Sequence, residues 1–120
     1  MRLKTFAMGM AIAGGLLGGT HLALTPLAYP DWTIDALWFV GSGLAIVMAA
    51  AANITDYQSM GLRSQMLVTA VNLVMSGFFA AAWLVLPAPQ VIVGGALFLG
   101  LAGCSLASAF ANHAPLAPPA

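Results

Sequence analysis

Four long apolar stretches, separated by short polar or proline-rich connections, dominate the pattern of this chain. A helix that crosses a bilayer needs about 20 mostly apolar residues. Each stretch is free of Asp, Glu, Lys and Arg, and together they predict spanning helices over residues 5–24, 36–52, 66–86 and 91–111. We therefore expect an all-α, polytopic integral membrane protein, in which residues 1–120 form a single membrane domain built as a four-transmembrane-helix bundle.

Prolines mark two of the three connections. Pro26 and Pro30 bracket the first, and Pro87 with Pro89 forms the third. Proline lacks a backbone donor and disfavours the helical conformation in the residue before it. We therefore expect the first and third helices to end before these prolines.

Polar residues mark the middle connection and the start of the second helix. Residues 53–63 contain Asn, Thr, Asp, Ser and Gly, which cap helices and form turns. Within this segment, Asn53 and Asp56 are interpreted as cap and turn residues. Asp31 is the expected N-cap of the second helix, and Asp35 is expected in its first turn, where a negative charge meets the positive end of the helix dipole.

The two ends of the chain carry different signals. Residues 1–4 and the apolar run after them resemble the start of a signal peptide, but the run is long and no good cleavage site follows. We expect the first span to be retained. Residues 112–120 are rich in Pro and Ala and predict a short flexible tail.

Composition narrows the function. The chain is 62% hydrophobic and 5% charged, against about 25% charged in soluble proteins. Three basic residues give no basic patch for nucleic acid, so the lipid bilayer is the expected partner. With one cysteine, no Ser/His/Asp set and no carboxylate pair in the spans, the sequence predicts no cofactor and no metal site and shows none of the usual catalytic constellations.

The basic residues predict the orientation. Arg2 and Lys4 precede the first span, and Arg63 lies between the second and the third. The positive-inside rule then places both termini in the cytoplasm. Aromatic residues suited to the membrane interface gather at the opposite side: Tyr29, Trp32, Trp38 and Trp83. From the compact, loop-poor architecture we expect a bacterial inner membrane protein.

Small residues recur at every fourth position in three spans, where they let helices approach closely. We expect Gly15, Gly19, Gly41 and Gly100 to lie at helix–helix interfaces. Gly14 and Gly18 stand beside the first of these ladders. The three ladders are Ala7, Ala11, Gly15 and Gly19; Gly41, Ala45, Ala49 and Asn53; and Ala96, Gly100, Cys104 and Ser108.

Five polar side chains are the candidates for a ligand site or a pathway. His21 is expected near the outer end of the first span, within reach of Asp31 or Asp35. It either ties the connection to the helix or acts as a proton-sensitive or ligand-binding group. Asn72 is the deepest strongly polar side chain, with Ser76 one turn along. Its amide either links two helices or contacts a substrate.

Three classes of function remain, of which an enzyme, as the cofactor-binding subunit of a larger complex, is the least favoured. The first is a non-enzymatic scaffold, accessory subunit or self-associating helix bundle, acting as a homo-oligomer or within a larger membrane complex. The alternative is a small-molecule or ion transporter or channel that works as a homodimer. That pathway would use His21, Asp31 and Asp35 as an outer vestibule and Asn72 as a deeper contact.

Overall fold

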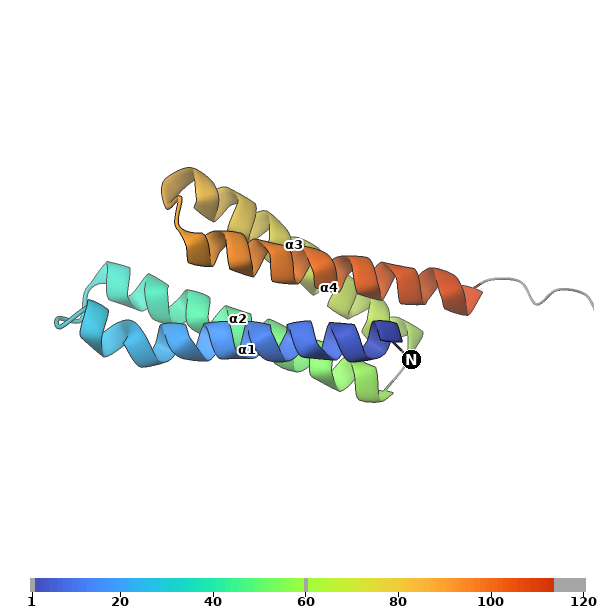
Figure 1. Ribbon diagram of the computed structural model, residues 1–120. Helices are drawn as coiled ribbons and strands as arrows, with labels where there is room; N and C mark the ends of the chain where they lie inside the picture. Colours follow the sequence, from blue (N-terminus) through green and yellow to red (C-terminus); the bar gives the residue numbers. More distant parts are fainter. Residues whose placement is uncertain (1, 60, 114–120) are drawn as a thin grey trace, which may run out of the picture.

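The chain folds into four long helices that run alternately up and down (Figure 1). The computed structural model describes residues 2–59 and 61–113, and these contain no strand. All four helices are long and apolar enough to cross a membrane, which confirms the predicted all-α bundle. Their bounds are α1 (Arg2–Ala28), α2 (Ile34–Ser59), α3 (Leu62–Val85) and α4 (Pro89–His113).

The helices form two hairpins, α1–α2 and α3–α4, that pack against each other (Figure 1). Contacts are most extensive within each hairpin, and α1 with α4 and α2 with α3 join the two. The two hairpin connections lie at one end of the bundle. The start of α1, the α2–α3 connection and the end of α4 lie at the other.

The prediction that the first helix ends before its proline is wrong, because α1 runs through Pro26 to Ala28. In the last turn Pro26 removes only one backbone donor. The surrounding groups remain bonded, because Tyr29 N–H donates to Thr25 O at 2.9 Å and the Thr25 hydroxyl donates to His21 O at 2.9 Å. At α4 the proline rule holds in its usual form, since a proline occupies the first helical position.

The middle connection is much shorter than predicted. α2 runs to Ser59 and α3 begins at Leu62, so most of residues 53–63 is helical. The interpretation of Asn53 and Asp56 as cap and turn residues is therefore wrong, because both lie inside α2 and both are buried.

Polar side chains do not interrupt α2 because they bond to its own backbone. Asn53 Nδ2 donates to Ala49 O at 2.8 Å, and Thr55 Oγ1 donates to Ala51 O at 2.9 Å. Bonds of this kind satisfy the side chains without ending the helix. In a helix that is surrounded by lipid, residues that usually favour turns are therefore a weak signal for the end of the helix.

Thr33, rather than Asp31, caps α2. The Ala36 N–H donates to Thr33 Oγ1 at 3.2 Å, in the usual N-cap geometry. Asp31 is exposed in the connection before the cap, while Asp35 lies in the first turn as predicted.

The α4 helix also extends further than the predicted span. It ends at His113, so the first two residues of the predicted tail, 112–120, belong to the helix. Residues 114–120 lie outside the described part of the chain.

Large apolar side chains fill the centre of the bundle. Phe98, Ile46 and Leu101 are almost completely buried. Phe79 stacks on Phe98 with ring centroids 5.8 Å apart and an interplanar angle of 18°. Many other large apolar side chains are exposed on the outer helix faces, as expected where lipid surrounds the bundle.

Candidate functional site

A reciprocal pair of amides joins the two hairpins inside the bundle. Asn53 on α2 and Asn72 on α3 are both 0% exposed. Asn53 Nδ2 donates to Asn72 Oδ1 at 2.7 Å, and Asn72 Nδ2 donates to Asn53 Oδ1 at 2.9 Å. Because Asn53 Nδ2 also faces the Ala49 carbonyl, the orientation of both amides is determined. This arrangement favours the helix link over a substrate contact, since the amide groups already bond to each other.

Further polar contacts join α3 to α4. The Thr69 hydroxyl donates to Ser105 Oγ at 2.9 Å, and Ser105 Oγ donates to Ala102 O at 3.0 Å. Gln65 Nε2 makes a longer bond of 3.4 Å to Ser105 O. With the amide pair, these contacts connect α2, α3 and α4 through hydrogen bonds that are buried or partly buried.

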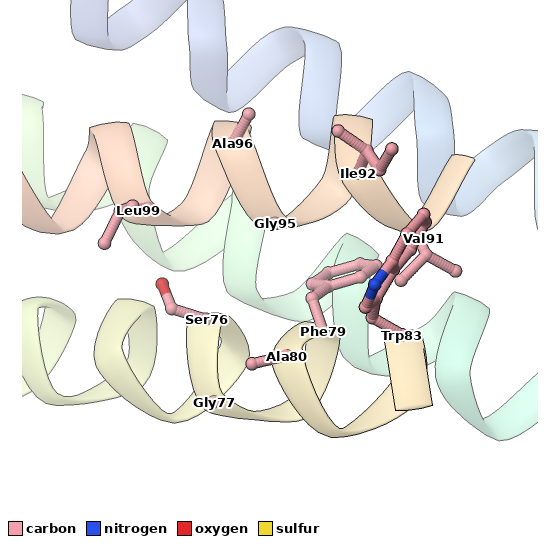
Figure 2. A pocket seen from close by; sticks show the side chains of 10 residues that line it. All are labelled: Ser76, Gly77, Phe79, Ala80, Trp83, Val91, Ile92, Gly95, Ala96 and Leu99. Carbon is pink, nitrogen blue, oxygen red and sulfur yellow. The ribbon is translucent and has the colours of Figure 1, made fainter. Parts of the chain in front are cut away.

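The Ser76 side chain on α3 points toward α4 and not toward α2 (Figure 2). Its hydroxyl donates to Asn72 O at 2.8 Å. It lines a cavity of about 550 Å³ between α3 and α4, together with Phe79 and Trp83 (Figure 2). The remaining wall is largely apolar, so this cavity suits an apolar group.

A larger groove, of about 730 Å³, lies between α2 and α3. Asp35, Trp38 and Ser42 line it from α2, and Phe78 lines it from α3. Tyr29, from the first connection, also reaches this groove. Of the candidate residues from the sequence, Asp35 is therefore the one placed on its wall.

His21 lies against the same end of the bundle. Its Nδ1 is 3.2 Å from Leu17 O, and its ring stacks on Phe39 with centroids 4.7 Å apart. Phe39 also lines the α2–α3 groove and is 5.5 Å from the Tyr29 ring. The histidine thus contacts α2 through an aromatic ring, in place of the expected hydrogen bond to Asp31 or Asp35.

On α1 the closest glycine contact lies one residue away from the expected position. Gly15 lies at the α1–α2 interface as expected, since a Cβ there would make an ordinary contact with the Ala50 side chain at 3.7 Å. Gly19 and Gly41 have no neighbour within 4 Å of the position a Cβ would take. The close contact on α1 is Gly18, where a Cβ would lie 2.8 Å from Gly43 O. Because an α-helix has 3.6 residues per turn, residues spaced strictly four apart rotate gradually around the helix and do not stay on one face. The buried stripe steps by four, three and four: Ala7, Ala11, Gly14 and Gly18.

Gly100 is the expected glycine that does lie at a tight contact. A Cβ there would lie 2.9 Å from Met10 Sδ on α1. On α4, the helix that carries Gly100, a Cβ on Gly94 would overlap the Phe79 ring.

Sequence reasoning identified Asn72 but missed its partner. Asn53 completes the Gly41–Ala45–Ala49 ladder at the expected spacing, and that position was the available signal. Thr69 and Ser105 gave no signal, because single hydroxyls are common in membrane helices and bond to their own backbone.

Among the described residues, no group of three or more His, Cys, Asp or Glu side chains is arranged to hold a metal ion. Comparison with protein-family models, with curated proteins and with solved structures gave no significant match.

Proposed function

We propose that this protein is a membrane-embedded scaffold, either an accessory subunit or a self-associating bundle, and that it acts by packing its helices against another chain. The observation that carries this proposal is the bonding of its interior polar groups. The amides of Asn53 and Asn72 bond to each other, and Thr69 bonds to Ser105. Such side chains hold helices together and leave the outer faces to make further contacts.

The outer faces support the same proposal. Gly19 is exposed, with no atom of the described chain within 4 Å of its Cβ position. Glycine weakens a helix by about 1 kcal/mol relative to alanine. Glycine on an outward helix face in lipid suits close packing by a second helix.

The bacterial inner membrane, with both termini in the cytoplasm, belongs to this proposal. It is supported by the positions of Arg2, Lys4 and Arg63, which lie at one end of the bundle. Reporter fusions at each terminus test the orientation, and a terminus accessible from outside the cell would contradict it.

Native mass spectrometry of gently extracted protein tests the scaffold proposal. We expect a complex with a second copy or with another membrane protein, and Gly19→Leu should lower its abundance at least fivefold. The fold should tolerate Gly19→Leu because the Cβ position is open. Gly9→Leu is the matched control, since it is equally open but points to a different side of α1. A protein that is monomeric throughout would contradict the proposal.

A second candidate is a homodimeric transporter or channel for a small molecule or ion. The groove between α2 and α3 favours it, because Asp35 and Ser42 line it and a second copy can close its open side. Flux in proteoliposomes should then fall in Asp35→Asn and Ser42→Ala, because both residues line the groove. Flux that neither substitution changes would contradict this candidate.

A further inference from the structure

The α2–α3 groove follows the axes of both helices. Residues three and four apart share one face of a helix. The groove is lined along such a face of α2 and along a second such face of α3. The α2 residues are Asp35, Trp38, Ser42 and Ala45, and the α3 residues are Val74, Phe78, Ala82 and Val85.

Its length matches the depth of one bilayer leaflet. From Asp35 to Ala45 the α2 wall rises by about 15 Å, at 1.5 Å per residue. Half of the hydrocarbon core is also about 15 Å. A groove of this length, with a volume of about 730 Å³, accommodates a lipid acyl chain lying along the helices.

The mouth of the groove has a different chemistry from its apolar floor. Asp35, in the first turn of α2, lies at the end where the two hairpin connections meet. Tyr29 and Trp38 line the groove beside it. A carboxylate and aromatic rings both attract an ammonium group.

Charge at the two ends of the bundle is segregated in the same sense. The end that carries the groove mouth has Asp31 and Asp35, while every Lys and Arg of the chain falls at the start of α1 or of α3, at the opposite end. A headgroup of net negative charge would face these carboxylates with no Lys or Arg at that end to balance them. A headgroup with an ammonium is favoured.

We propose that the α2–α3 groove is a binding site for one phospholipid with an ammonium headgroup, of the phosphatidylethanolamine type. One acyl chain lies in the groove, and the ammonium contacts Asp35 between Tyr29 and Trp38. This site goes beyond the scaffold proposal and does not depend on it.

The test is native mass spectrometry of the delipidated full-length protein, titrated with phosphatidylethanolamine or with phosphatidylglycerol of the same acyl chains. We expect tighter binding of the first lipid, by up to about fivefold, the ratio that an exposed ion pair can provide. Equal binding of the two lipids would overturn the headgroup assignment.

Paired variants assign the binding to this groove. Asp35→Asn should abolish the headgroup preference, whereas Asp31→Asn, the same charge change outside the groove, should retain it. Gly41→Leu should lower binding of both lipids at least fivefold because it projects into the groove, and Gly9→Leu, equally open but outside the groove, is its control. Equal effects within either pair would overturn the site.

The same spectra separate this site from self-association. Gly19→Leu tests the contact between copies, and Gly41→Leu tests the groove. A dimer that holds no lipid and loses its second copy in Gly41→Leu would show that another chain fills the groove, which would overturn the lipid proposal.

Discussion

In each hairpin a glycine lets the two helices pack closely, but the group that packs against the glycine differs. In α1–α2 the backbones themselves meet, since a Cβ on Gly18 would lie 2.8 Å from Gly43 O and 2.9 Å from the Val47 backbone nitrogen. In α3–α4 an aromatic ring covers the backbone, since Phe79 lies over Gly94. A backbone contact cannot relax without moving a helix, whereas a ring can turn. The two glycine contacts therefore differ in how much substitution they tolerate.

The largest effect is expected at the backbone contact. Gly18→Ala should lower the free energy of unfolding by about 2–3 kcal/mol, because overpacking a tight contact outweighs the helix propensity gained. Reversible unfolding in mixed detergent micelles measures it. Gly19→Ala, one position along and open, is the matched control. A Gly18→Ala protein as stable as the wild type would show that α1 and α2 are not in such close contact.

A smaller loss is expected in the second hairpin. Gly94→Ala should cost about 1–2 kcal/mol, since the Phe79 ring must shift. Phe79→Leu in the same chain should recover part of that cost, because the two changes share one contact. Thermal unfolding of the single and double variants measures the coupling. Strictly additive costs would contradict the ring-on-glycine contact.

The link between the hairpins should contribute about 1 kcal/mol. Asn53→Ala and Asn72→Ala each leave one buried amide without its partner, so the double variant should cost less than the two single costs combined. A double-mutant cycle in detergent unfolding measures this coupling. Zero coupling would mean that the reciprocal bonds do not hold α2 against α3.

The smallest effect is expected at two glycines that have no close neighbour. Gly19→Ala and Gly41→Ala should raise the stability of the monomer by up to about 1 kcal/mol, because both Cβ positions are open and alanine favours the helix. Unfolding at low protein concentration, where self-association is weak, measures it. A loss of stability at either site would mean that the glycine has a close neighbour in the monomer.

The fold was predictable because the bilayer restricts the choices. Four uncharged runs of about 20 residues have few stable alternatives to four spanning helices. The helix ends were less predictable. Pro26 and Asn53 act as helix breakers in the pattern, yet both lie inside helices because the nearby polar groups find local bonds.

The candidate site was predictable only in part. Asn72 could be identified because a strongly polar side chain in the middle of a span requires a partner. The choice of Asn53 as that partner depends on how α2 and α3 are rotated about their axes. The choice between Gly18 and Gly19 depends on rotation in the same way, since adjacent positions differ by about 100°. Spacing alone does not determine that rotation.

The reciprocal amides also constrain how the protein is made. Asn53 and Asn72 are 19 residues apart, on either side of the connection between Ser59 and Leu62. If α2 entered the bilayer alone, Asn53 Nδ2 would keep its bond to Ala49 O, but its Oδ1 would meet hydrocarbon without a partner, at a cost of about 1–3 kcal/mol. Entry of α2 and α3 together as a helical hairpin satisfies both amides from the start. The insertion machinery would then release these two segments as a pair during translation, although in the finished fold they belong to different hairpins.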